Sequence, residues 1–394
     1  MKIVTLGEIC SQITDGTHHT PTYTEKGIPF LRVTDITGSN ESKKFISENE
    51  HRQLIKRCNP EKGDILYTKN GTIGVAKEID WDFEFSIFVS LCLLKANPNF
   101  VFNRYLVHYL NTNFALRQAT QNSKKATISN LHLIEIKKIK IPLPPLPTQK
   151  KIAAILDEAD KLRQQSKQLI ENYNQLTQSL FLDMFGDPVT NPKGYPISSV
   201  GEQCNVKGGK RVPKGEKLIK EDTGYPYIKA GNIKNGKVTL KNLEYLNYET
   251  REKIKRYTVE KGDVCITVVG INIGDIGIVP AELDKANLTE NANKLLIKDK
   301  CRLNGIYLTL ALQSDYIQKQ IHKKTMAVGV PKLALFRIQE LLILLPPINL
   351  QNQFAERLQA IEAQKAQAQQ ELAKAEDLFN SLLQRAFKGE LVKD

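Results

Sequence analysis

The chain repeats five short phrases, in the same order, about two hundred residues apart. LGEIC (6–10) returns as VGEQC (200–204), GIPFLRVTDI (27–36) as GYPYIKAGNI (224–233), KGDIL (62–66) as KGDVC (261–265), GTIG (71–74) as GINIG (270–274), and LPPLPTQ (143–149) as LPPINLQ (345–351). Self-similarity of this kind is typical of duplicated domains. A chain of 394 residues can hold two domains of roughly 150 residues with connecting segments. The duplication therefore predicts two similar folded domains.

The formal net charge of +13 is the most informative property of the composition. Excess Lys and Arg attracts polyanions because their binding releases condensed counterions, so nucleic acid is a candidate ligand. The alternative is a basic surface without a nucleic-acid ligand. Basic residues are densest over 206–220 (VKGGKRVPKGEKLIK).

Three features of the composition bear on location and redox state. No run of about 18 apolar residues occurs, so we expect no membrane span. The first residues become polar too quickly for a signal peptide. The six cysteines are too far apart for a CxxC motif. We therefore expect a cytoplasmic protein with reduced thiols and no metal site.

Each copy reads as a mixture of short strands and helices. In the first copy, β-like runs (IPFLRVTDI, DILYTK and FEFSIFVSLCLLKA) are separated by Gly and Asn turns. Apolar spacing predicts a helix over 104–121, with a counterpart over 306–322. Each copy closes in a hydrophobic segment that ends in Pro-Pro, which stops the preceding strand.

Two long, polar segments carry apolar residues at heptad spacing and are predicted to be helices. The first runs from about Thr148 to Asp183 and the second from about Leu350 to Lys388. The predicted domains are thus a first target-binding domain (1–145), a first long helix (146–186), a second domain (187–347) and a second long helix (348–394). The residues that we expect to pair the helices are Ile152, Ile155, Leu162, Leu169, Leu176, Leu358, Ile361, Leu372, Phe379 and Leu382.

A narrow apolar stripe on a lone helix is marginally stable in water, so we expect the two helices to pack on each other. The alternative is that each stripe packs on its own domain. Because the chain leaves one helix, builds a domain and enters the other, antiparallel pairing would relate the copies by a pseudo-two-fold axis. The expected fold class is α+β, with two similar mixed α/β domains joined by an antiparallel coiled coil.

In this arrangement the chain resembles the specificity subunits of type I restriction–modification enzymes. The resemblance covers the full length and is carried by LPPLPTQKKIAAILDEADKL (143–162), FGDP (185–188), LPPINLQNQFAERL (345–358) and SLLQRAFKGEL (381–391). It implies two target recognition domains, each reading one half of a bipartite double-stranded DNA target, with the helices as spacer. It also implies two modification subunits that methylate adenine with S-adenosylmethionine, and restriction subunits that use ATP and Mg²⁺. By this resemblance the chain itself carries no cofactor and no catalytic activity.

The residues agree with a non-catalytic role. Leu143 and Leu345 precede the two Pro-Pro pairs, where an adenine methyltransferase needs Asn or Asp. No GxxxxGK[ST] phosphate loop occurs. The triplet Glu135-Ile136-Lys137 resembles a nuclease motif, but no Pro-Asp partner precedes it. His18 and His19 could bind metal, but no further Cys/His cluster supports this, and a polar loop is the simpler interpretation.

Three loops in each copy could contact DNA, because base edges are read by Arg, Lys, Asn or Gln and phosphates are bound by Lys or Arg. They are 15–22, 69–72 and 122–127 in the first copy, and 207–214, 270–272 and 323–328 in the second. The candidate DNA-binding residues are His18, His19, Lys69, Asn70, Thr72, Lys124, Lys125, Lys207, Lys210, Arg211, Lys214, Asn272, Lys323 and Lys324. For any one lysine, solvent exposure without a ligand is the alternative. The first loop differs strongly between the copies, which predicts an asymmetric target.

Two other classes of function stay open at this point. One is an enzyme with a nuclease or methyltransferase centre. The other is a helical scaffold whose basic domains read no DNA sequence. Turnover by the purified chain would indicate the first, and the absence of salt-dependent DNA binding would indicate the second.

Overall fold

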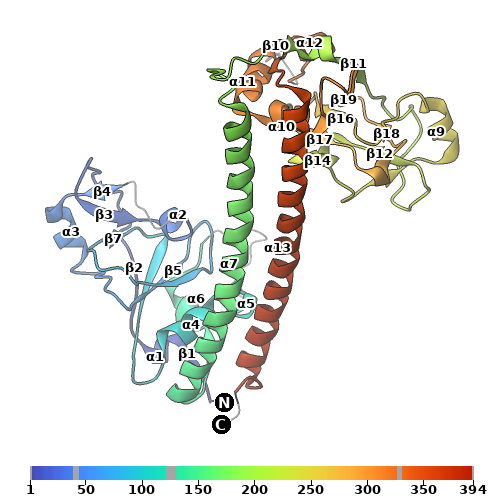
Figure 1. Cartoon of the computed structure of the whole chain (residues 1–394). Helices are drawn as coiled ribbons and strands as arrows, with labels where there is room; N and C mark the ends of the chain where they lie inside the picture. The colour runs from blue at the N-terminus through green and yellow to red at the C-terminus, as the bar shows by residue number, and fades with distance from the viewer. Residues whose placement is uncertain (1, 39–43, 121–129, 326–330, 393–394) are drawn as a thin grey trace. The chain divides into compact units, whose positions relative to one another are not determined.

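The computed structural model describes residues 2–38, 44–120, 130–325 and 331–392, and these form two compact units (Figure 1). Unit 1 comprises Met1–Gln168 and Ala368–Asp394, and unit 2 comprises Leu169–Gln367. The division therefore falls within both long helices, whereas the sequence placed the domain boundaries at their ends. Each unit contains one half of each helix because each half packs on a different domain.

Unit 1 is built on a four-stranded antiparallel sheet in the order β2-β8-β5-β6. The strands of this sheet are β2 (Cys10–Asp15), β5 (Ile65–Thr68), β6 (Ala76–Glu78) and β8 (Leu91–Ala96). A smaller sheet has the order β4-β3-β7, and β1 pairs with β9. The remaining elements are β1 (Lys2–Thr5), α1 (Leu6–Ile9), β3 (Ile28–Leu31), α2 (Val33–Ile36), β4 (Phe45–Ile46), α3 (Glu48–Leu54), β7 (Ser86–Ile87), α4 (Asn103–Leu110), α5 (Asn113–Thr120), α6 (Leu133–Lys137) and β9 (Lys140–Leu143).

Unit 2 repeats this order of elements on a larger sheet, β11-β19-β16-β17-β14-β13. Its strands are β11 (Cys204–Gly208), β13 (Ile233–Lys234), β14 (Gly236–Val238), β16 (Val264–Thr267), β17 (Ile276–Ile278) and β19 (Ala292–Ile297). The other elements are β10 (Ile197–Ser199), α8 (Val200–Gln203), β12 (Pro226–Ile228), η1 (Ala230–Asn232), β15 (Glu244–Tyr245), α9 (Tyr248–Ile254), η2 (Ala281–Leu283), β18 (Asn287–Leu288), α10 (Gly305–Gln313), α11 (Asp315–Lys324), α12 (Leu335–Gln339) and β20 (Leu342–Leu344). The duplication seen in the sequence is thus a duplication of the fold.

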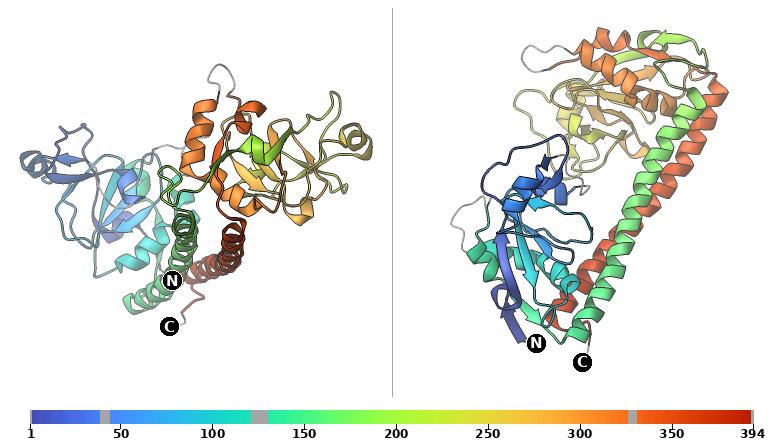
Figure 2. Two further views of the ribbon diagram at one scale, coloured as in Figure 1. Left: turned by 45° about the horizontal axis from the view of Figure 1, so that its top comes forward. Right: turned by 90° about the vertical axis from the view of Figure 1, so that its left-hand side faces the viewer.

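The two long helices are α7 (Leu146–Phe185) and α13 (Ile348–Lys388). In unit 1 the first part of α7 lies beside the last part of α13, where the Arg163 guanidinium stacks 4.2 Å from the Phe379 ring centroid. In unit 2 the last part of α7 lies beside the first part of α13, with the Phe181 and Phe354 rings 5.7 Å apart. The helices therefore pair in opposite directions within each unit (Figures 1 and 2), which confirms the predicted antiparallel coiled coil.

The residues predicted to pair the two helices are buried on α13 but only partly on α7. On α13 the predicted residues Leu358, Ile361, Leu372, Phe379 and Leu382 are all buried or half-buried. On α7, Ile152 is buried, as are Leu156 and Ala159.

The second predicted row of α7 was wrong, because Ile155, Leu162, Leu169 and Leu176 are 38–50% exposed. Ile152 and Ala159 belong to one apolar row of α7. A second row can lie three residues after each of them, as Ile155 and Leu162 do, or four residues after, as Leu156 does. The row that lies four residues later, beginning at Leu156, is the one that packs in the core. The more hydrophobic leucine row faces outward instead.

Each predicted domain helix is broken into two. The segment 104–121 forms α4 and α5, which meet at Thr112, whose hydroxyl accepts from the Ala115 amide. The segment 306–322 forms α10 and α11, and Ser314 at the break has an extended backbone and accepts from the Ile317 amide. At both breaks a hydroxyl side chain caps the start of the second helix, and the first helix ends just before that residue.

A buried glutamine explains why the Pro-Pro phrase recurs with Gln six residues after its first Leu. Gln149 accepts from the Phe102 amide at 2.8 Å and donates to the carbonyls of Phe100 and Pro144. Gln351 repeats these bonds with the Asn304 amide and the carbonyls of Arg302 and Pro346. Both glutamines are fully buried, so each fixes the start of a long helix against its own domain.

Candidate nucleic-acid interface

In unit 1 the structure brings the first two candidate loops together at one end of the sheet. The loop after β5 begins at Lys69, whose amide donates to the Ser90 carbonyl at 2.9 Å. The Lys69 carbonyl accepts from the Leu131 amide at 2.7 Å, so the chain that follows 122–127 lies against this loop. The end of β2 lies there too, because Nζ of Lys69 is 2.9 Å from Oδ2 of Asp15. Residues 122–127, and with them Lys124 and Lys125, lie outside the described residues.

The structure argues against Lys69 as a DNA-binding residue. Its side chain is 6% exposed and pairs with Asp15, which is also buried. Arg57 and His18 bind the same carboxylate. Burial of Asp15 opposes ionisation, but the hydrogen bonds and charges of Lys69 and His18 outweigh it and lower the pKa of Asp15. Sequence patterns could not separate a lysine that neutralises a buried carboxylate from one that faces solvent.

The other candidates in this part of unit 1 are closer to the surface. His18, His19 and Thr72 are exposed, and Asn70 is half-buried. The side-chain oxygen of Asn70 is buried without a hydrogen-bond partner in the described structure. Arg57, which the sequence did not single out, is more than half exposed and lies beside Asp15. Its position at this end of the sheet adds it to the candidate DNA contacts.

Unit 2 places its loops in the same way. The amide of Val268, after β16, donates to the Asn291 carbonyl, and the Leu333 amide donates to the Val268 carbonyl. The Gly270 amide donates to Pro331, just beyond the third candidate loop. The Lys210 amide donates to the Leu288 carbonyl at 2.8 Å, which holds the basic loop after β11 at the same end. The first two predicted loops therefore lie at one end of the sheet in each unit, next to the described residues that follow the third loop (Leu131 in unit 1, Pro331 and Leu333 in unit 2). Residues 326–328 of the third loop of unit 2 lie outside the described residues.

Most candidate DNA-binding residues of unit 2 are exposed to solvent. Lys207, Lys210, Lys214, Asn272 and Lys323 are exposed. Arg211 is exposed but pairs with Glu290 at 2.5 Å, and Lys324 pairs with Glu340 at 2.7 Å. Ion pairs of exposed side chains are weak, so Arg211 can exchange its carboxylate for a phosphate, whereas Lys324 is half-buried. The basic side chains of the loop 207–214 are therefore accessible to a ligand.

Two glycines fix the path of the first loop in both units. A side chain on Gly16 would collide with the backbone carbonyl of Ile87, and one on Gly209 with the carbonyls of Leu288 and Thr289. Each glycine lets the chain after β2 or β11 pass close to the strand of the smaller sheet. Here the units differ, since strand pairing places Asp15 where unit 2 has Gly208. Two copies of one framework therefore present different side chains.

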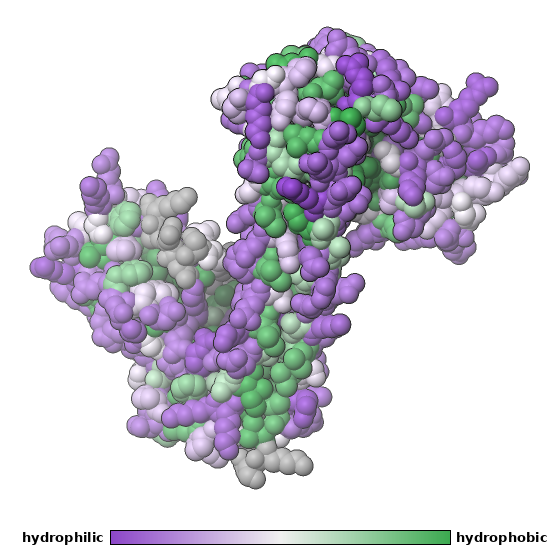
Figure 3. Space-filling model, in the orientation of Figure 1, coloured by the Kyte–Doolittle hydropathy of each residue, from purple (hydrophilic) through white to green (hydrophobic). Residues whose placement is uncertain are grey.

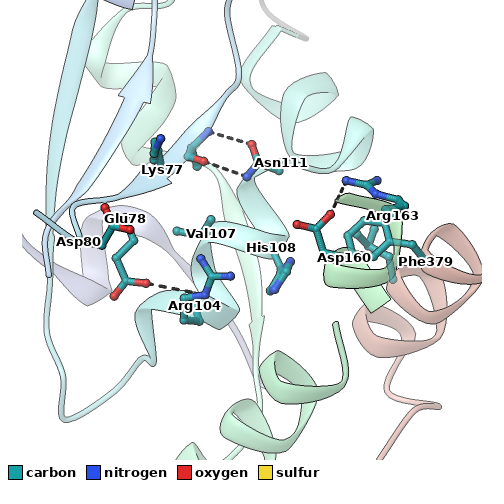
Figure 4. Close-up of a pocket in the computed structure, with 12 residues that line it drawn as sticks. Lys77, Glu78, Asp80, Arg104, Val107, His108, Asn111, Asp160, Arg163 and Phe379 are labelled. Atoms are coloured by element: carbon teal, nitrogen blue, oxygen red, sulfur yellow. Dashed lines mark hydrogen bonds and ion pairs between the residues drawn. The ribbon is translucent and has the colours of Figure 1, made fainter. Parts of the chain in front are cut away.

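A cavity of about 640 Å³ lies in unit 1 between β6, α4 and the paired helices (Figure 4). Two ion pairs lie in its wall, since Arg104 is 4.0 Å from Glu78 and Arg163 is 2.5 Å from Asp160. None of the candidate DNA-binding residues lines it. The cavity is therefore separate from the candidate interface.

Two kinds of feature are absent from the described part of the chain. Over 2–38, 44–120, 130–325 and 331–392, no group of three or more His, Cys, Asp or Glu side chains is arranged to hold a metal ion. Within the same ranges, no helix has the length and apolar character needed to cross a membrane.

Comparison with known proteins identifies the family. The family model described as the type I restriction modification DNA specificity domain matches residues 1–172 and 192–377. The chain belongs to this family. The two matched stretches correspond to the two copies of the fold, and the family's role is DNA sequence specificity in type I restriction–modification systems. The scaffold alternative is therefore not favoured.

Relatives within this DNA specificity family span most of the chain. The specificity subunit of the type I restriction enzyme EcoBI from Escherichia coli is 24% identical, over 93% of this chain and 80% of its own. The MjaIX specificity subunit from Methanocaldococcus jannaschii is 22% identical, over 99% of this chain and 92% of its own. The crystal structure of the type I S subunit from M. genitalium has a TM-score of 0.61 at 18% identity and covers 98% of this chain and 96% of that one. These likenesses support the α+β fold with two recognition domains and long helices.

Proposed function

We propose that this chain selects the DNA target of a type I restriction–modification complex, with each unit reading one half of a bipartite, asymmetric sequence. The observation that carries the proposal is that the first two predicted loops, after β2 and β5 in unit 1 and after β11 and β16 in unit 2, meet at one end of the sheet in both units. Glycines and backbone hydrogen bonds hold these loops in place, so their side chains are preorganised for base reading. The +13 net charge adds attraction for phosphate.

Asymmetry of the target follows from the different side chains on the two frameworks. Unit 1 carries a buried carboxylate surrounded by Lys69, Arg57 and His18. The matching end of unit 2 carries Gly208 and the exposed lysines of 207–214. Because base edges differ in their donors and acceptors, two such surfaces select different half-sites.

The exposed apolar row on α7 supports the binding of partner subunits. Ile155 and Leu162 in unit 1, and Leu169 and Leu176 in unit 2, are more than a third exposed. Figure 3 shows apolar surface gathered along the part of the helix pair that belongs to unit 1. We infer that two modification subunits pack helices on these residues and that restriction subunits join the larger complex. S-adenosylmethionine, ATP and Mg²⁺ belong to those partners, and this chain carries no catalytic group.

A domain-exchange experiment tests the assignment of half-sites. In the hybrid chain, residues 187–347 are replaced by a second copy of 1–145, so that both ends of the coiled coil carry the same reader. The hybrid and the parent are each co-expressed with the methyltransferase subunits in a host without other adenine methylation, and methylated adenines are mapped by single-molecule sequencing. The parent should give an asymmetric bipartite target, and the hybrid a palindromic one made of the parent's first half-site. An unchanged asymmetric target in the hybrid would refute the proposal.

A further inference from the structure

The tip of the loop between β16 and β17 carries an isoleucine that is 100% exposed, Ile271. The loop backbone around it is held firmly. The Gly274 amide donates to the Thr267 carbonyl at 3.0 Å, and the Asp275 amide donates to the Asn272 carbonyl at 3.1 Å. Ile273, two residues on, packs against the core of unit 2. Ile271 thus contributes nothing to the folding of the unit, although its backbone is fixed.

The glycine turn aims these side chains outward. Gly270 and Gly274 have φ values of +97° and +92°, which a residue with a side chain rarely adopts. The matching loop of unit 1 runs from Gly71 to Gly74, is one residue shorter, and presents Thr72. The longer tip with an apolar side chain is therefore particular to unit 2.

The surroundings of Ile271 are polar and basic. Asn272 beside it is exposed. Val269, two residues before, forms a β-bridge with Lys332, and the exposed lysines of 207–214 lie at the same end of the sheet. A single apolar side chain at the apex of a basic surface fits a ligand whose charged backbone flanks an apolar group. Thymine in the major groove of DNA presents such a group, its C5 methyl.

We propose that Ile271 contacts the C5 methyl of a thymine in the half-site read by unit 2, and that Asn272 binds N6 and N7 of the adenine in the same or the adjoining base pair. An A·T pair displays both features in the major groove, and Asn is suited to the adenine edge. The two residues are consecutive at a narrow tip, so they reach neighbouring positions. This inference rests on the proposed function, since it names the bases that one unit reads.

The test uses the full chain assembled with its methyltransferase subunits and duplexes that carry the mapped target. Each thymine of the unit 2 half-site is replaced in turn by deoxyuridine, which removes only the methyl group, and binding is measured by titration. At one position the parent complex should lose about fourfold in affinity, the effect of one buried methyl group. Ile271→Ala should weaken binding to the thymine duplex by a similar or larger factor and abolish the response at that position alone. Asn272→Ala should relax selection of the A·T pair by about 5- to 100-fold.

Matched variants separate this contact from general effects. Thr72→Ala, at the corresponding tip of unit 1, should leave the deoxyuridine response of the unit 2 half-site unchanged, and Ile271→Val should keep it. Equal weakening of every duplex by Ile271→Ala would mean that the side chain wedges between bases or acts non-specifically, and this result would overturn the inference. A unit 2 half-site without an A·T pair would overturn it as well. Loss of any defined target in the parent would refute the proposed function itself, which distinguishes the two failures.

Discussion

The Nε2 atom of His108 in α4 lies 2.8 Å from Oδ1 of Asp157 in α7. This bond joins the first recognition domain to the long helix, and Arg104 binds the same carboxylate. The His108 side chain is buried, and its burial lowers its pKa against the opposing effect of Asp157. The imidazole is therefore neutral near pH 7 and donates its Nε2 proton to Asp157.

The lowered pKa of His108 predicts that unit 1 loses stability in mild acid. The unfolded chain binds a proton on this histidine as the pH falls through about 6.5, whereas the folded chain resists protonation, so the free energy of unfolding decreases below that pH. Urea denaturation of the parent between pH 8 and pH 5.5 should show this decrease, and His108→Asn should reduce it. His322→Asn, which changes an exposed histidine of unit 2, is the control and should keep the parent's pH dependence.

The pair formed by Lys69 and Asp15 should contribute to stability rather than to DNA binding. Lys69→Met leaves a buried carboxylate with only His18 and Arg57, so we expect a loss of about 2 kcal/mol in the free energy of unfolding. Asp15→Asn with Lys69→Met should cost less than the sum of the two single changes. Additive costs in this double-mutant cycle would contradict the buried pair.

The two buried glutamines predict matched, unit-specific losses. Gln149→Leu removes three hydrogen bonds in unit 1 and Gln351→Leu removes the corresponding three in unit 2. Each change should cost about 2–4 kcal/mol, since the backbone groups left behind are buried. Hydrogen exchange should show faster exchange at 100–102 for the first variant and at 302–304 for the second. Equal effects on both units would show that the glutamines do not act locally.

Phosphate contacts in unit 2 should appear in the salt dependence of DNA binding. Lys210→Ala with Lys214→Ala should weaken binding on specific and non-specific duplexes alike and reduce the slope of log K against log salt by about 1–2. Lys285→Ala also removes an exposed lysine of unit 2, but one that pairs with Glu260 away from the candidate loops. This control should leave the slope unchanged.

Leucines on the outer face of α7 should serve the modification subunits. Leu162→Glu places a charge on an exposed apolar position, so we expect it to weaken assembly with those subunits by about tenfold or more without unfolding the chain. Gln164→Glu adds the same charge at another exposed position of α7 and should assemble normally. Analytical ultracentrifugation of the mixtures measures both. Normal assembly of Leu162→Glu would refute this assignment.

Periodicity in the sequence predicted the long helices well because they are regular, begin after Pro-Pro and end before a glycine. It also predicted α13's packed face, since the residues named there are all buried or half-buried. On α7 it failed for Leu162 and its row, because a heptad pattern has two flanks and hydrophobicity favoured the one that faces outward. The breaks at Thr112 and Ser314 were missed because a hydroxyl residue within an apolar pattern is read as a tolerated helical position.

The candidate interface was predictable as loops but less so as residues. The glycine phrases located the turns after β5 and β16, and the strand register placed these turns at the same end of each sheet as the ends of β2 and β11. Whether a lysine side chain is exposed depends on its neighbours in the folded sheet. Asp15, which pairs with Lys69, lies far from it in the sequence, so no local pattern shows that this lysine is buried. The exposure of Ile271 and the role of Arg57 likewise arise from tertiary structure, so no local pattern identifies them.

The division of the chain affects how it is made on the ribosome. Unit 2 is one continuous stretch, Leu169–Gln367, whereas unit 1 needs residues from Ala368 onward. Phe379 and Ala386 are buried in the same core as Ile152 and Ala159. The domain synthesised first therefore cannot complete its core until residues 379–386 emerge, so a nascent chain presents an open apolar groove while unit 2 is already folding.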